Sequence, residues 1–146
     1  MDTRTPQKRS EIMSAVRTKD TGPELSARKV LYALGYRYRL HRKGLPGRPD
    51  IVFPRLLKVV FIHGCFWHGH GCSKGRLPKS RLDYWRPKIV GNRRRDARNI
   101  ASLKQLGWKP FVVWQCELKN SKALVRRLRT FLGRSRLRKK TKKGRI

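Results

Sequence analysis

Hydrophobic positions recur with the spacing of an α-helix in three stretches of the chain, residues 21–35, 92–108 and 121–133. In the first stretch Thr21 suits the N-cap, and Glu24 stands three residues later, as a capping box requires. Along the second stretch the predicted inward positions are Ala97, Ile100, Leu103 and Leu106. These patterns predict three amphipathic helices that each bury one face.

Strands are indicated by β-branched and nearly unbroken apolar runs, at residues 50–53, 57–63 and 109–116. Residues 36–42 alternate between polar and apolar side chains, which predicts an edge strand. The segment 74–91 reads as a loop with a short helix at residues 80–85. Helices, then strands, then a helix–strand–helix order predict an α/β fold with a small mixed β-sheet flanked by helices.

The ends of the chain are more polar than its middle. Residues 1–9 read as a flexible basic arm, residues 10–133 as one domain, and residues 134–146 as a basic tail that we expect to be disordered. No apolar run approaches the roughly 20 residues that a bilayer span needs. The first 20 residues are polar and charged and do not resemble a secretory signal peptide, so we expect a cytoplasmic protein.

The large positive net charge of the chain indicates what kind of partner it binds. Thirty-nine Lys and Arg against 8 Asp and Glu give a formal net charge of +31. Such an excess repels itself inside a compact fold, so a polyanion is the natural partner and nucleic acid is the first candidate. An anionic membrane is the second, but we find no strongly apolar face to insert into one. The tail holds eight of the basic residues, so most of the excess lies on the rest of the chain.

One loop, "HGCFWHGHGC" at residues 63–72, gathers three of the four histidines and two of the three cysteines. Cys65, His70 and Cys72, with Cys116 after a predicted strand, offer a Cys3His set that suits a closed, structural zinc site. The alternative for Cys116 is a small buried hydrophobic residue. Three cysteines cannot all pair with one another, which favours thiolate chemistry in a reducing compartment over disulfides.

Asp50 begins an apolar strand after "PGRP", where a carboxylate is unfavourable unless it is paired or binds a cation. It suits Mg²⁺, and His63 and His68 remain available for general acid–base work near neutral pH. With a basic surface, this combination indicates phosphodiester hydrolysis. The alternatives are that Asp50 pairs with Arg48 or caps a turn, and that the two histidines are spare ligands or face solvent.

Phe66 and Trp67 lie in the same loop. Apolar side chains of this kind can wedge between base steps and unstack them. An equally good interpretation is that they pack under the loop as a small satellite core.

Four segments together carry a family resemblance: "GLPGRPDIVF", "FIHGCFWHGHGC", "NRRRDARNIASLKQLGW" and "VVWQCEL". They closely resemble the very-short-patch (Vsr) mismatch-repair endonucleases, from about residue 10 to residue 118. The resemblance implies a restriction-endonuclease-like core, catalytic Mg²⁺ and structural Zn²⁺. It also implies that the chain nicks double-stranded DNA 5′ to the thymine of a T·G mismatch left by deamination of 5-methylcytosine. The expected setting is the bacterial nucleoid, with the chain as a monomer that other repair proteins accompany.

The resemblance also implies roles for single residues. Asp50 and the backbone carbonyl of Ile62 match the Mg²⁺ ligands, although the family commonly has threonine at the position of Ile62. His68 matches the histidine that activates water, His63 a second active-site histidine, and Glu24 an acidic residue near the metal. The zinc ligands match Cys65, His70, Cys72 and Cys116.

Residues that touch DNA are implied in the same way. Phe66, Trp67 and Trp85 match aromatic wedges that enter the base stack from the major groove, and Met13 matches a residue that inserts from the other groove. We also expect Arg48 to contact DNA.

Two other functions remain open from the sequence. One is a zinc-stabilised nucleic-acid-binding protein without catalysis, which a nicking assay on a T·G duplex separates from an enzyme. The other is a nuclease whose histidines hold the catalytic metal themselves, for which loss of Asp50 would have a mild effect.

Overall fold

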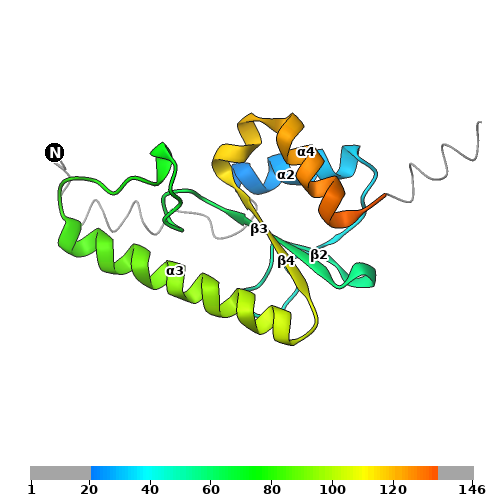
Figure 1. Cartoon of the computed structure of the whole chain (residues 1–146), viewed down its shortest axis with the longest axis horizontal. Coiled ribbons are helices and arrows are strands. Elements are labelled where there is room, and N and C mark those ends of the chain that lie inside the picture. Colours follow the sequence, from blue (N-terminus) through cyan, green and yellow to red (C-terminus); the bar gives the residue numbers. More distant parts are fainter. Residues whose placement is uncertain (1–20, 135–146) are drawn as a thin grey trace, which may run out of the picture.

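The computed structural model describes residues 21–134, and Figure 1 traces them in colour. Its helices and strands are α2 (Gly22–Ala33), β1 (Arg39–Leu40), β2 (Ile51–Phe53), β3 (Lys58–His63), α3 (Leu82–Gln105), β4 (Lys109–Trp114) and α4 (Ser121–Leu132). The predictions for the basic arm, for Met13 and for the tail beyond Arg134 lie outside the described residues. No helix among the described residues is both long enough and apolar enough to cross a bilayer.

The four strands form one mixed sheet in the order β1-β2-β3-β4. The pairs β1–β2 and β2–β3 are antiparallel, whereas β3 and β4 run parallel with His63 opposite Trp114. The predicted edge strand is confirmed as β1, although only two residues of it pair. Because β3 and β4 are parallel, the segments that follow them leave the sheet at the same end.

Helices cover both faces of the sheet, which explains why its strands read as unbroken apolar runs. Alternate residues of β3 point to opposite faces. Val60 and Ile62 join a core cluster with α2 and α4, and Val59 and Phe61 join a second cluster with Leu103 of α3. Figure 1 shows α2 and α4 on one side of the sheet and α3 on the other. The predicted α/β fold with a small mixed sheet is confirmed.

Helix α2 begins and ends where the sequence predicts. The hydroxyl of Thr21 accepts a hydrogen bond from the amide of Glu24 at 3.4 Å, so Thr21 is the N-cap. Gly35 follows the helix with φ +94°, a left-handed conformation that favours glycine over other residues. The cap fixes the first turn of α2, and this turn carries Glu24.

The prediction of a loop with a short helix over residues 74–91 is wrong in its second half. Leu82–Gln105 is a single 24-residue helix that contains Pro87. Proline in a helix interior removes one N–H donor, so other contacts must stabilise the helix here. Ile89, two residues after Pro87, is only 5% exposed, and its burial favours a helix that continues past the proline. Of the four predicted inward residues of α3, Leu103 is buried and Ile100 packs beside it, but Ala97 and Leu106 are exposed.

Candidate active site and metal centres

A cleft of about 830 Å³ opens where the first turn of α2, the ends of β2 and β3 and the middle of α3 meet. Its lining includes the four residues predicted to be catalytic, Glu24, Asp50, His63 and His68, together with Ile62 and Arg48. Arg48 is exposed and has a left-handed backbone, φ +47°. The fold therefore brings residues from three separate segments of the chain into one cavity.

Two carboxylates face each other on one wall of this cleft. Oδ2 of Asp50 accepts a hydrogen bond from the backbone amide of Ile62 at 2.7 Å rather than pairing with Arg48. Glu24 is only 4% exposed, and its ligand oxygen lies within 4.8 Å of the ligand atoms of Asp50 and His41. Burial raises the pKa of Asp50 to about 6; the Ile62 amide opposes this rise and the charge of Glu24 adds to it. A buried and a half-buried carboxylate this close together offer oxygen ligands that fit a hard divalent cation.

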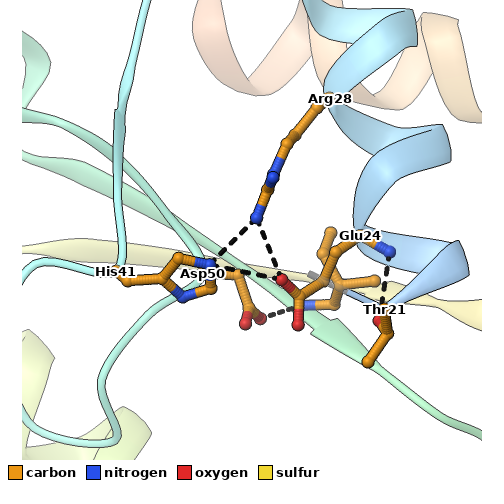
Figure 2. Close-up of polar contacts among 6 residues, drawn as sticks. Thr21, Glu24, Arg28, His41 and Asp50 are labelled. Atoms are coloured by element: carbon orange, nitrogen blue, oxygen red, sulfur yellow. Dashed lines mark hydrogen bonds and ion pairs between the residues drawn. The ribbon is translucent and has the colours of Figure 1, made fainter. Parts of the chain in front are cut away.

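Arg28 and His41 complete this group, and neither was predicted from the sequence as a site residue (Figure 2). Nη2 of Arg28 lies 3.2 Å from Oε2 of Glu24 and 2.9 Å from Nε2 of His41. The His41 amide also donates to the Asp50 carbonyl at 3.2 Å, which ties the end of β1 to the start of β2. We call Glu24, Arg28, His41 and Asp50 the acid cluster.

A pair of imidazoles forms another wall. The rings of His63 and His68 stack with centroids 3.8 Å apart and planes 1° from parallel. Nδ1 of His68 lies 2.6 Å from Oδ2 of Asp96 on α3. Burial and the neighbouring His68 lower the pKa of His63 to about 4, so His63 is neutral near pH 7. The partner of His68 was missed in the sequence, although Asp96 is the one acid in a run of arginines, "NRRRDAR".

Ile62 has two environments. Its side chain packs in the core cluster with α2 and α4, while its backbone amide holds Asp50. Ile62 therefore contributes its main chain to the cleft and an aliphatic side chain to the core.

The predicted zinc ligands lie together at the end of the sheet. The ligand atoms of Cys65, His70, Cys72 and Cys116 are all within 4.8 Å of one another, and we call them the thiol cluster. Cys65 follows β3 and Cys116 follows β4, so the parallel pairing of these strands brings the two segments together. The Cys116 amide donates to Sγ of Cys65 at 3.4 Å, and Sγ of Cys116 lies 3.6 Å from Nδ1 of His70. Three sulfurs and one imidazole nitrogen fit a tetrahedral zinc site.

The thiols of this cluster affect one another. Desolvation raises the pKa of Cys116 to about 11, and the neighbouring thiols of Cys65 and Cys72 add smaller contributions in the same direction. Desolvation also acts to raise the pKa of Cys72, but hydrogen bonds from His70, Cys65 and two backbone amides outweigh it and lower that pKa to about 6.

Glycine makes the loop compact enough to hold these ligands. A Cβ on Gly75 would lie 1.9 Å from the carbonyl oxygen of His70, so the backbone could not approach as it does. Gly69 has φ +63°, and a Cβ there would lie 2.8 Å from a methyl group of Ile89. The side-chain amide of Asn92 on α3 donates a hydrogen bond to the backbone carbonyl of Trp67 in the loop at 2.9 Å. The loop is therefore attached to α3 as well as to the sheet.

The loop aromatics pack on one another beside the cleft. The rings of Phe66, Trp67 and Trp85 contact each other edge to face, with centroids 5.2–5.9 Å apart. All three are half-buried, and Nζ of Lys88 lies 5.7 Å from the Trp67 ring. We call these three residues the aromatic cluster. Its members keep surface that a further ring can contact.

Comparison with known proteins shows which family the sequence matches. Residues 1–74 match the family described as DNA mismatch endonuclease Vsr. The chain is 58% identical over 131 residues to the type II nicking enzyme V.XorIIP of Xanthomonas oryzae pv. oryzae, covering 90% of this chain and 96% of that one. It is 50% identical to the type II nicking enzyme V.NmeAIP of Neisseria meningitidis serogroup A, covering 84% and 86%. It is also 40% identical to the DNA mismatch endonuclease Vsr of Escherichia coli, covering 80% and 75%.

Proposed function

This chain belongs to the Vsr family of DNA mismatch endonucleases, and from that premise we propose that it nicks one strand of double-stranded DNA 5′ to the thymine of a T·G mismatch. Such mismatches arise when 5-methylcytosine is deaminated. The single observation that carries the proposal is the shared cleft, in which the buried carboxylate of Glu24, the half-buried carboxylate of Asp50 and an imidazole paired with a carboxylate face one cavity.

The acid cluster is the proposed site of catalytic Mg²⁺. Asp50 and the backbone carbonyl of Ile62 would hold the ion, with Glu24 beside them. When bound, Mg²⁺ supplies positive charge that stabilises the developing charge on the phosphate. The raised pKa of Asp50 and its main-chain hydrogen bond support this assignment, because they describe a carboxylate that is desolvated and aimed by the backbone.

His68 is the proposed general base. If its Nδ1–H donates to Asp96, the ring is held in the tautomer whose Nε2 carries a lone pair. Nε2 would then take the proton from the attacking water. His63, stacked on His68 and neutral near pH 7, would face the scissile phosphate without competing for that proton.

The thiol cluster is the proposed site of structural Zn²⁺, which would fix the loop that carries His68 and the aromatic cluster. Together with the mixed sheet, we assign these parts to a restriction-endonuclease-like core. Phe66, Trp67 and Trp85 would wedge into the base stack from the major groove and Met13 from the other groove, and Arg48 would contact the DNA. We propose that the enzyme acts as a monomer in the bacterial nucleoid, alongside other repair proteins.

A nicking assay on a T·G duplex tests this function, with a T·A duplex and an EDTA reaction as controls. We expect cleavage of the thymine strand of the T·G duplex alone, and only with Mg²⁺. Replacement of His68 by alanine should slow nicking by roughly 10²–10⁴-fold, the usual contribution of a general base, and leave mismatch binding intact. Binding without nicking by the wild-type chain would instead identify a nucleic-acid-binding protein.

A further inference from the structure

Arg28 extends from α2 into the acid cluster, and it has no role in the function proposed above. Figure 2 shows one nitrogen of its guanidinium at the apex of a triangle with the carboxylate of Glu24 and the ring of His41, which also contact each other at 3.4 Å. Its side chain is 14% exposed and that of Glu24 is 5% exposed, so the charges meet largely out of water. The inference below rests on the proposed metal site at Asp50 and Glu24.

One nitrogen of Arg28 makes both contacts. Nη2 carries two hydrogens, and it lies 3.2 Å from Oε2 of Glu24 and 2.9 Å from Nε2 of His41. A guanidinium has only donors, so it bonds to Nε2 of His41 in the tautomer whose Nε2 carries the lone pair. The same Nε2 lies 3.4 Å from Oε2 of Glu24. The ring of His41 and the carboxylate of Glu24 thus hold the same guanidinium nitrogen in a three-membered cluster.

The same carboxylate belongs to the pair that faces the metal. The ligand atoms of Glu24 and Asp50 lie within 4.8 Å of each other, and Glu24 adds to the forces that disfavour charge on Asp50. A fixed cation beside Glu24 reduces this repulsion, and it also repels a second cation that approaches the same oxygens.

We propose that Arg28 is a resident cation of the active site, which positions the Glu24 carboxylate next to Asp50 and sets how much Mg²⁺ the enzyme requires. His41 fixes Arg28 in this place. Arg28 is a positioning residue, since it acts through Glu24 and is not among the residues that line the cleft. Its removal therefore has two opposite consequences: the carboxylates attract Mg²⁺ more strongly, but Glu24 loses the contact that orients it.

Calorimetric titration of the full-length protein with Mg²⁺, without DNA, measures the first consequence. We expect Arg28→Gln, which keeps an N–H donor but loses the charge, to lower the dissociation constant for Mg²⁺ by about tenfold, because a unit charge within a few ångströms is worth on the order of 1 kcal/mol or more. Arg28→Lys should stay within about threefold of wild type because it keeps the charge. Lys29→Ala is the matched control: it removes one positive charge from an exposed site of the same helix, and the constant should not change.

The Mg²⁺ dependence of nicking measures the second consequence. For Arg28→Gln we expect half-maximal nicking at about tenfold less Mg²⁺ and a lower maximal rate, whereas a purely structural defect would lower the rate and raise the Mg²⁺ requirement. Arg28→Met, which keeps the aliphatic stem, replaces Arg28→Gln if that variant does not fold.

Unchanged or weaker Mg²⁺ binding by a folded, charge-removing variant would overturn the resident cation. A different outcome is that the variant binds Mg²⁺ more tightly while the wild-type chain fails to nick the T·G duplex. This pair of results would support the resident cation and reject the proposed function. The two proposals thus fail by different measurements.

Discussion

The acid cluster and the thiol cluster are both assembled from distant segments at the ends of strands, but they are held in different ways. The acid cluster is anchored on regular elements: Glu24 and Arg28 lie on α2, while His41 directly follows β1 and Asp50 directly precedes β2. Cys65, His70 and Cys72 lie in the turn-rich segment after β3, and Cys116 lies in a 3-10 turn after β4. The difference indicates that the acid cluster is formed by the fold itself, whereas the thiol cluster depends more on the ion it would bind.

The two clusters also differ in the charged groups that they contain. The acid cluster holds its own cation, because Arg28 contacts Glu24. The thiol cluster has His70 as its one nitrogen donor, and the burial and crowding of its sulfurs raise the pKa of Cys116. Removing metal should therefore leave the first cluster in place and loosen the second.

The largest expected effect comes from the acid cluster. Asp50→Ala should reduce nicking by at least about 10³-fold, because the proposed metal contributes several kcal/mol to the transition state. The variant should fold as well as wild type, as measured by its melting temperature. Asp83→Ala removes an exposed acid from the first turn of α3 and is the matched control. A mild loss for Asp50→Ala would favour a nuclease whose histidines hold the catalytic metal.

A substitution in the thiol cluster should lower the stability and the metal content of the protein, whereas Asp50→Ala should lower its activity. Cys116→Ser should lose zinc, measured by atomic absorption, and its free energy of unfolding should fall by about 3 kcal/mol when zinc is 100 times above its dissociation constant. Ser73→Ala, beside the cluster, should change neither quantity. Unchanged zinc content in Cys116→Ser would remove Cys116 from the ligand set.

The pH dependence of Mg²⁺ stabilisation gives a sharper comparison. The pKa of Asp50 in the fold is raised from 3.8 to about 6, so its contribution to stability is full below pH 4 and is lost as pH rises through 6. Bound Mg²⁺ should offset this loss, which is on the order of 3 kcal/mol at pH 8 and smaller at pH 5. Thermal melts with and without Mg²⁺ measure the difference. Asp50→Asn should abolish it, and an equal Mg²⁺ effect at both pH values in wild type would contradict the assignment.

The smallest expected effect tests the link between the loop and α3. Asp96→Asn keeps the shape of the side chain but weakens its hold on the imidazolium form of His68. We expect nicking to slow by roughly tenfold, near the lower end of what a positioning contact contributes, with Mg²⁺ binding unchanged. Asp83→Asn, in the same helix, controls for the change of charge. A rate equal to wild type would show that His68 does not depend on Asp96.

The fold was largely predictable because its signals are local. The apolar runs at β2, β3 and β4 reflect burial on both faces, and the Thr21 cap marks the start of α2. The loop predicted up to residue 91 was wrong in its second half, because the contacts of α3 with the loop come from residues about 20 positions away and leave no local pattern in the sequence.

The site was predictable only in part. The thiol cluster could be predicted as a set because its residue types are rare and concentrated in the sequence. Arg28 and His41 are ordinary residues in a basic chain, and only the fold brings them together across 13 positions. Asp96 was missed for the same reason, since 28 positions separate it from His68.

The hydrogen bond that aims Asp50 has a consequence for how this sequence can change. Its donor is the main-chain N–H of residue 62, which every amino acid except proline possesses. Substitution at this position thus alters the hydrophobic packing beneath the sheet without removing the anchor of the carboxylate. A change between isoleucine and threonine at this position would therefore preserve that anchor, because the side chain points into the core and the carboxylate is held by the main chain.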